Sequence, residues 1–243
     1  MTNSIRRLTA VLLAIVLCPP LVHAYEFVPT DSEWQAWPGY CKAKYVWYAV
    51  GQRSKFANQV SNIHKQQLVP WEDAGIRGAH HFCAGMIWLK RAWLEQDTKQ
   101  KSYMLREAAN ETLFTFNGSS NKSAPQFAYV TIQLARILYE QGEFERSIQT
   151  LQSVIAAQPK TDVLYSATAV MQKKIGRLDE AKETLLRGFA ALDGASAEIN
   201  YNLGLIYLEL GELDDAVRHA ELAYDQGFPL PGLRVKLEKL GRM

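Results

Sequence analysis

The histidines and cysteines near residue 80 are the part of this sequence that most suggests chemistry. His80, His81 and Cys83 stand within four positions, and Cys41 and His64 are the further candidate ligands. Imidazole and thiolate groups bind zinc, and in an exported protein also copper. Neighbouring side chains on a helix point about 100° apart, so His80 and His81 are poorly placed to reach one ion. The pattern favours two separate histidines, and a metal site at these residues is the alternative.

Cys41 and Cys83 have a second interpretation that competes with metal binding. They are the two cysteines left once the N-terminal 24 residues are removed. In an oxidising compartment an even pair favours a disulfide, which would consume both thiolates. The alternative is a pair of buried free thiols, since cysteine packs well as a small apolar residue. We predict a Cys41–Cys83 disulfide, which requires Cα atoms within about 7 Å of each other.

Residues 1–24 have the organisation of a secretory signal peptide. Residues 6–7 are arginines, residues 8–17 are almost wholly apolar, and Val-His-Ala at 22–24 offers cleavage before Tyr25. The apolar run is about 10 residues, well short of the roughly 20 that a membrane span needs. The segment therefore predicts an exported protein, periplasmic in a bacterium, with no integral membrane span after cleavage.

The charge balance and the motifs narrow the function classes. Removing residues 1–24 takes away two of the 27 Lys and Arg and none of the 25 Asp and Glu, which leaves a formal net charge of zero. This argues against nucleic acid as the main partner, because phosphate binding needs a positive excess. The sequence has no Gly-x-Ser-x-Gly, no His-Glu-x-x-His and no Walker loop. We therefore predict no enzyme activity and no cofactor.

Aromatic residues are dense between positions 34 and 93. Such density is typical of a helical core, and we favour that interpretation. The alternative is a surface that stacks on a saccharide or forms a partner site, within an envelope pathway. Under that alternative, recognition of a saccharide or metal would depend on Trp37, Trp71, His80 and His81. The aromatic residues are Trp34, Trp37, Tyr40, Tyr45, Trp47, Tyr48, Trp71, Trp88 and Trp93.

Most of the segments that carry these aromatic, histidine and cysteine residues have helical periodicity. Residues 40–51, 79–96 and 100–116 predict helices with apolar faces. Gly85 lies in the second of them, where we expect it to let a neighbouring helix approach closely. Residues 25–36 predict an extended lead. Loop or linker signals occur in two segments, 52–78 and 117–123. Within the first we expect a polar helix at 54–67 and a loop at Val69-Pro70-Trp71.

Residues 128–228 contain one motif three times. Gly142, Gly176 and Gly211 are separated by 34 and 35 residues, and each stands between two helical patterns. A period in this range indicates stacked helical hairpins. One hairpin cannot bury its apolar face alone, so the copies stack and the last one needs a cap. Residues 229–240 have the single apolar stripe that such a capping helix requires.

From residue 128 onward the sequence resembles the tetratricopeptide repeat family. Leu203, Gly204 and Tyr207 occupy the family's Leu-Gly-x-x-Tyr positions in the third copy. The first copy departs from the pattern at Ser147, where the family prefers Ala, and the second has Gln172 where Tyr is usual. The resemblance is to an exported bacterial member, and it implies an all-α solenoid of stacked hairpins with a C-terminal capping helix.

The predicted organisation combines this solenoid with an aromatic-rich helical region. The repeats and the capping helix occupy residues 124–243, and the N-terminal region occupies residues 25–123. We expect a degenerate helical hairpin at 79–116 within the N-terminal region. The three repeats are predicted at about 128–161, 162–195 and 197–230.

In this family the first helices of the repeats line a concave groove that binds peptides or proteins. The resemblance therefore implies a non-catalytic scaffold or adaptor of the cell envelope. Aromatic and cationic groove positions suit an extended peptide with some acidic character. A weakly binding inner face is the alternative, and the pattern with which some members clamp a C-terminal carboxylate is not reproduced. The transferred groove residues are Tyr129, Arg136, Tyr139, Lys173, Lys174, Tyr201, Leu205 and Leu208.

Overall fold

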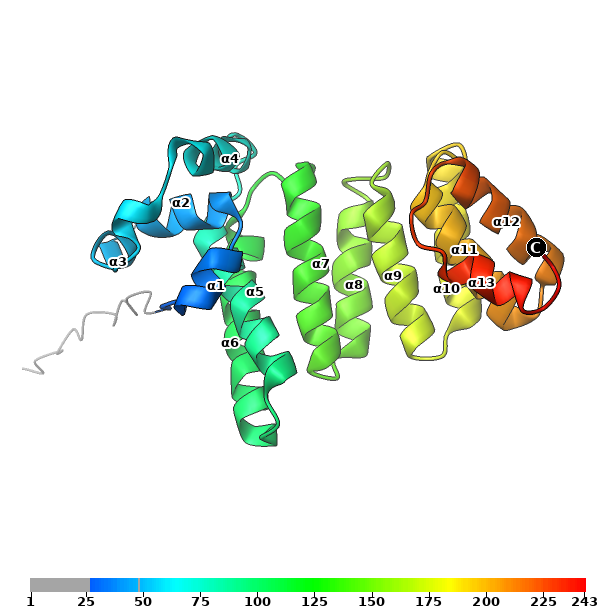
Figure 1. Cartoon of the computed structure of the whole chain (residues 1–243), viewed down its shortest axis with the longest axis horizontal. Helices are drawn as coiled ribbons and strands as arrows, with labels where there is room; N and C mark the ends of the chain where they lie inside the picture. Colours follow the sequence, from blue (N-terminus) through cyan, green and yellow to red (C-terminus); the bar gives the residue numbers. More distant parts are fainter. Residues whose placement is uncertain (1–26, 48) are drawn as a thin grey trace, which may run out of the picture.

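The computed structural model describes residues 27–47 and 49–243, and every regular element within them is a helix. The predicted all-α solenoid is confirmed (Figure 1). The predicted signal peptide and its cleavage site before Tyr25 lie outside the described residues. None of the described helices is long and apolar enough to cross a membrane.

Short helices precede the solenoid, and the first of them corrects the predicted extended lead. Thr30 caps α1 because its side chain accepts the backbone N–H of Glu33, while the Glu33 carboxylate accepts the N–H of Thr30. This capping box starts a helix at Asp31, where aromatic and proline residues suggested extended chain. The elements are α1 (Asp31–Ala36), α2 (Gly39–Trp47), α3 (Ala49–Gln52), η1 (Ala57–Gln59) and α4 (Asn62–Asp73).

Helix α4 corrects a second prediction, the loop at Val69-Pro70-Trp71. The helix begins after Ser61, which forms a capping box with His64, and it continues through Pro70 to Asp73. Proline removes one helical hydrogen bond and clashes with the preceding turn. Here Leu68 and Trp71 are 4% and 7% exposed, so their burial holds the last turn in helical form. Local sequence signals were overridden by packing.

Helices α5 (Ala79–Leu94) and α6 (Thr98–Gly118) form the predicted degenerate hairpin. Gly85 permits the close approach that we expected. A Cβ at this position would lie 2.3 Å from Thr112 Oγ1 and 2.8 Å from Gln133 Nε2. Gln133 belongs to the next helix and donates its side-chain N–H to Thr112 Oγ1 at 2.8 Å and to the Phe82 carbonyl at 3.0 Å. Because glycine has no side chain, α5 and α6 and the following helix, Pro125–Glu140, can approach one another closely at this position.

The three repeats follow, and their turn glycines have the backbone conformation that the spacing predicted. Gly142, Gly176 and Gly211 have φ values of 82°, 81° and 78°, a left-handed region that glycine enters without steric cost. The repeat helices are α7 (Pro125–Glu140), α8 (Phe144–Ile155), α9 (Asp162–Lys174), α10 (Leu178–Ala191), α11 (Ala197–Leu210) and α12 (Leu213–Asp225). The predicted cap is α13 (Gly232–Glu238).

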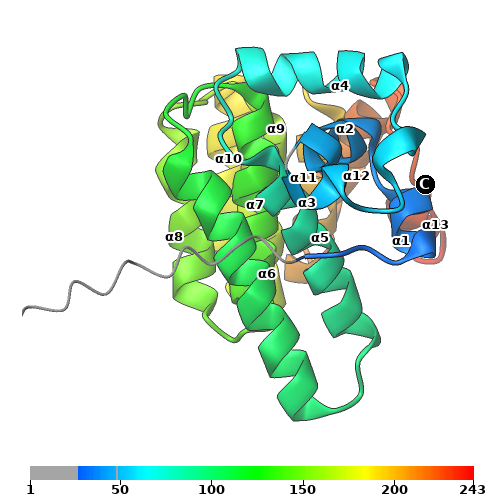
Figure 2. The ribbon, with the colours of Figure 1, turned by 90° about the vertical axis from the view of Figure 1, so that its left-hand side faces the viewer.

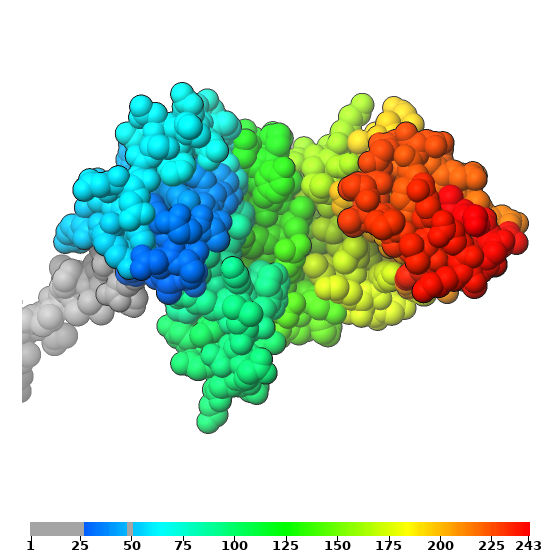
Figure 3. All heavy atoms as spheres, in the orientation of Figure 1, coloured from blue at the N-terminus to red at the C-terminus, as the bar shows by residue number. Residues whose placement is uncertain are grey.

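The first helices of the repeats form the inner face of a curved stack. Helix α7 packs against α9, and α9 against α11, more closely than α8, α10 and α12 pack against one another. Helices α1 to α4 and the C-terminal helix α13 project to the same side of the stack (Figure 2). In Figure 3 the green and yellow-green atoms of the repeats lie between these two projecting ends.

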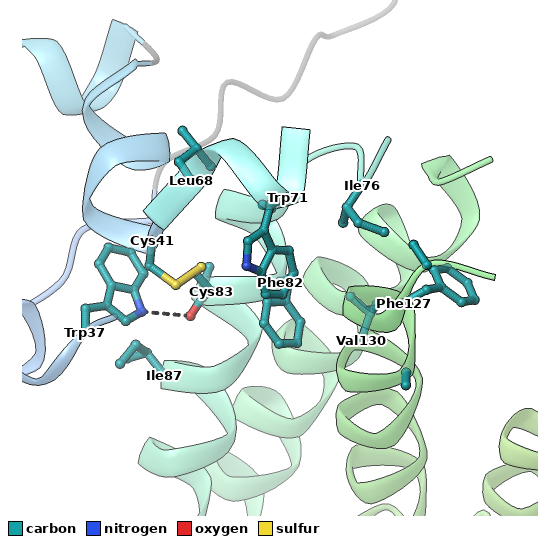
Figure 4. Packing of buried hydrophobic residues seen from close by; sticks show 14 of the residues in the cluster. Trp37, Cys41, Leu68, Trp71, Ile76, Phe82, Cys83, Ile87, Phe127 and Val130 are labelled. Atoms are coloured by element: carbon teal, nitrogen blue, oxygen red, sulfur yellow. Dashed lines mark hydrogen bonds between the residues drawn. A yellow bond between two sulfur atoms is a disulfide. The ribbon is translucent and has the colours of Figure 1, made fainter. Parts of the chain in front are cut away.

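The disulfide between Cys41 and Cys83 fastens the N-terminal helices to α5. The two Cα atoms are 5.7 Å apart, and both cysteines are fully buried. Beside the bridge, the Trp37 indole donates its N–H to the Cys83 carbonyl at 3.1 Å (Figure 4). Trp34 and Trp37 are 1% and 3% exposed, and Trp34 stacks on Phe56 with ring centroids 4.5 Å apart. These rings form a helical core, as we favoured from the sequence.

The buried core does not break at the predicted linker. One cluster of buried apolar side chains runs from Phe27 through α5, α7 and α8 into α9, ending at Met171. A second cluster joins the last two repeats to Leu233 and Leu237 of α13. The domain limits drawn at residues 123 and 124 stay a prediction, and the packing is continuous across them.

Candidate functional site

A cavity of about 510 Å³ lies where the N-terminal helices meet the first repeat. We call it the junction cavity. Its walls come from four helices: α2 and α4 of the N-terminal region, α5 of the hairpin, and α7 of the solenoid. The lining residues are Tyr40, Trp71, Phe82, Met86, Leu89, Trp93, Tyr129, Ile132, Gln133 and Arg136.

Helical spacing places the side chains of two walls. Phe82, Met86, Leu89 and Trp93 follow one another at intervals of four, three and four residues, so they form one stripe along α5. On α7, Tyr129, Ile132, Gln133 and Arg136 form a second stripe by the same rule. The two stripes line one cavity because α5, α6 and α7 meet at Gly85, where Gln133 of α7 reaches the Phe82 carbonyl of α5.

An aromatic stack forms the third wall. The rings of Tyr40 and Trp71 are nearly parallel, with centroids 4.4 Å apart and an interplanar angle of 16°. Trp71 also contacts Phe82, with centroids 5.3 Å apart (Figure 4). Burial, and to a smaller extent the neighbouring Tyr129, raises the pKa of Tyr40. Tyr40 therefore stays neutral at physiological pH, and this wall carries no charge.

Arg136 is the one charged residue among those that line the junction cavity. Its side chain is exposed, and within residues 27–47 and 49–243 no carboxylate forms an ion pair or hydrogen bond with it. By contrast, Arg91 is paired with Glu33 and Arg177 with Glu145. The cavity is thus an apolar and aromatic surface with a single available positive charge.

The eight predicted groove residues do not lie on one uniform surface. Tyr129 and Arg136 line the junction cavity. Tyr139 and Lys174 line a second cavity of about 680 Å³ at the turns of the first two repeats, where the Lys174 ammonium lies 4.8 Å from the Tyr139 ring centroid. Lys173 is paired with Glu209 of α11.

The last three predicted groove residues pack at the C-terminal end. Tyr201 stacks on Phe228 with ring centroids 4.2 Å apart, next to the capping helix. Leu205 and Leu208 are half-buried against the second core cluster. The first repeat therefore offers open aromatic and cationic side chains, whereas the third uses its corresponding positions mainly for packing.

The two histidines of the possible metal site contact protein groups. His81 Nδ1 lies 2.5 Å from Glu111 Oε2 of α6. Burial, then the charges of His81 and Lys44, lowers the pKa of His80 to about 3, so it stays neutral at physiological pH. The disulfide consumes both thiolates. Within the part of the chain that the structure describes, no three His, Cys, Asp or Glu residues are grouped to hold a metal ion.

Of the two tryptophans considered for saccharide recognition, one is buried and one lines the junction cavity. Trp37 is buried and presents no open face to a ligand, whereas Trp71 lines the junction cavity. Sequence reasoning missed Met86 and Leu89 as cavity residues because the centre of α5 is apolar on all sides. The spacing of Phe82, Met86, Leu89 and Trp93 was a usable signal, but it becomes informative only once the partner helix is known.

Comparison with known proteins supports the repeat assignment. Family models of the tetratricopeptide repeat match residues 132–161 and 172–229. No curated protein matches this chain.

Solved structures with a similar arrangement are themselves repeat proteins. The first TPR of Spaghetti (RPAP3) bound to the HSP90 peptide SRMEEVD is 18% identical, with a TM-score of 0.43 over 48% of this chain and 92% of that one. YrrB, a TPR protein with an unusual peptide-binding site, is 17% identical, with a TM-score of 0.46 over 76% and 89%. TTC0263, a thermophilic TPR protein in Thermus thermophilus, is 17% identical, with a TM-score of 0.44 over 69% and 97%. The family-model matches show that residues 132–161 and 172–229 of this chain consist of tetratricopeptide repeats.

Proposed function

We propose that this protein is a non-catalytic scaffold of the cell envelope that docks an extended segment of a partner protein on the inner face of its solenoid. Tetratricopeptide repeats are protein-interaction modules, which gives the general class. The observation that carries the proposal is the junction cavity, where Arg136, which has no ion-pair partner among the described residues, stands among exposed aromatic side chains at the start of the inner face.

The residue types at this surface are those that dominate protein interfaces. Tyr129 is 56% exposed and Trp93 is 46% exposed, so both rings are open to a partner. Tyrosine, tryptophan and arginine are enriched among residues whose truncation costs most binding energy. An exposed cluster of these three types supports docking at the inner face.

Farther along the inner helices, charged side chains of both signs lie among apolar ones. Lys173 is paired with Glu209 across α9 and α11. Burial, then the charge of Asp162, raises the pKa of Glu198 at the start of α11. A mixed surface of this kind suits the backbone and the polar side chains of an extended segment.

Two features support the envelope setting. The predicted signal peptide at residues 1–24 directs export, and the Cys41–Cys83 disulfide suits an oxidising compartment. We therefore propose the periplasm as the location of the protein and an envelope assembly as the setting of its partner.

The test is photo-crosslinking in cells that export the protein. A photoreactive amino acid replaces Tyr129 or Val170 on the inner helices, and Leu186 on the outer helix α10 is the matched control. We expect one dominant protein adduct from positions 129 and 170 and none from 186. Equal labelling from position 186, or no adduct from the inner positions, would contradict docking at the inner face.

A further inference from the structure

We infer that the junction cavity is an anchor subsite for one large apolar side chain of the docked segment, with an adjacent acidic side chain held by Arg136. This inference rests on the proposed docking function and names the chemistry that the cavity selects. The subsite is not a feature of the repeats alone, because α2, α4 and α5 supply most of its wall.

The size and composition of the cavity argue for an apolar anchor. Its volume of about 510 Å³ lies within the range of roughly 300–1,000 Å³ that is typical of small-ligand sites. Tyr40, Trp71 and Phe82 contact one another in series, so they present a continuous aromatic surface. Aromatic side chains on a partner bury a large apolar area and gain further from edge and offset ring contacts. Met86 adds a flexible thioether that adapts to the shape of an entering group.

The charge argues for one carboxylate beside that anchor. Arg136 is the sole charged lining residue, and the guanidinium presents donors that match a carboxylate in a bidentate arrangement. An apolar wall excludes water from one side of the pair, which strengthens the attraction. A phosphate group would call for further cations, and no lysine or second arginine lines this cavity.

The carboxylate has two possible sources, an acidic side chain or the C-terminus of a chain, and the inference commits to the side chain. The inner face continues from Arg136 along α9 and α11, so an extended segment has surface to contact on the far side of the anchor. A randomised linear dodecamer library displayed on phage tests this choice, because fusion at the C-terminus removes the free carboxylate of every displayed peptide.

The selection uses the mature protein and matched variants at exposed positions. Arg136→Glu has Arg187→Glu on α10 as its control, and Tyr129→Ala has Tyr103→Ala on α6. All four side chains are substantially exposed, so we expect each variant to keep the helical circular dichroism and melting temperature of the parent protein.

We expect the parent protein and both controls to select peptides in which a large apolar residue lies next to Asp or Glu. Arg136→Glu should replace that acid by Lys or Arg, and Tyr129→Ala should lose the apolar preference. For a selected peptide made with an amidated C-terminus, Arg136→Glu should weaken binding about tenfold or more in fluorescence anisotropy, and Arg187→Glu should leave it unchanged.

Three different results would overturn the inference, and they are distinguishable. Peptides that bind equally to Arg136→Glu and Tyr129→Ala, but lose binding to Val170→Arg in the middle of the inner face, would leave the docking function intact and remove the anchor subsite. Binders from a library whose peptides end in a free C-terminal carboxylate, with none from the C-terminally fused library, would refute the side-chain assignment. Failure to select any peptide from either library would count against the docking function and the subsite together.

Discussion

Removing the Cys41–Cys83 disulfide should cost the N-terminal region about 4 kcal/mol of stability. The bridge joins residues with a sequence separation of 42, and the loop-closure relation gives an unfolded-state entropy loss of about 13 cal/mol/K for a loop of this length. At 25 °C this corresponds to about 4 kcal/mol. The double change Cys41→Ala, Cys83→Ala introduces no polar atom into a site where both cysteines are fully buried, so the loss of the cross-link dominates.

The distribution of tryptophan gives this prediction a regional assay. All 6 tryptophans lie between positions 34 and 93, so tryptophan fluorescence reports on the N-terminal region and the hairpin. Circular dichroism reports on every helix, including the repeats. In urea, we expect the fluorescence transition of the double variant to move to lower denaturant, while a helical transition from the last two repeats, which have a separate buried cluster, persists near its original midpoint.

Reduction supplies the control for this experiment. The parent protein treated with dithiothreitol should follow the double variant, and dithiothreitol should leave the double variant unchanged, because no thiol remains in the mature chain. A stability loss below about 1 kcal/mol in the fluorescence transition would refute the reasoning. It would mean that the unfolded region retains enough structure to hold these two positions together without the bond.

Three further changes test the packing and the ion pairs. Gly85→Ala should destabilise the protein by about 1–3 kcal/mol in urea denaturation, because its Cβ would lie 2.3 Å from Thr112 Oγ1. Leu151→Ala should cost about 2–5 kcal/mol, since Leu151 is fully buried and leaves a cavity. Glu33→Gln should lower stability at pH 7. Burial raises the pKa of Glu33, but hydrogen bonds from Arg91 and Thr30 outweigh it and hold that pKa below its ordinary value of 4.5. Its contribution is therefore present above pH 4.5 and disappears as the pH falls through the folded-state pKa, so the variant and the parent should converge in acid.

Matched controls keep these three tests specific. Gly118→Ala adds a Cβ whose nearest neighbour is an Arg77 side-chain carbon at 3.4 Å, so it should be close to neutral. Leu186→Ala removes a side chain that is 38% exposed and should cost far less than the buried change. The stated contact at Gly85 would be contradicted if Gly85→Ala were as neutral as Gly118→Ala. The burial of Leu151 would be contradicted if Leu151→Ala cost no more stability than Leu186→Ala. The role of the Glu33 carboxylate would be contradicted if the stability difference of Glu33→Gln persisted in acid.

The sequence by itself determined the repeat architecture and the cross-link. Gly142, Gly176 and Gly211 mark turns because a left-handed residue between two amphipathic helices is a local requirement, visible wherever it recurs at a fixed period. The Cys41–Cys83 pairing was also accessible, since only two cysteines remain after the predicted signal peptide. These features depend on neighbours in the chain or on counting, and neither requires knowledge of how helices are placed in space.

Only the tertiary structure decided which of the predicted surfaces could form a site. Tyr129 and Arg136 were expected in a groove, and Trp71 was expected in a loop or an aromatic core, yet all three line one cavity. Their meeting depends on the path of α4 through Pro70 and on the close packing of α5 against its neighbours at Gly85. Both are outcomes of burial between segments far apart in sequence, where the gain from packing exceeds the local cost, and no periodicity within a single helix records that balance.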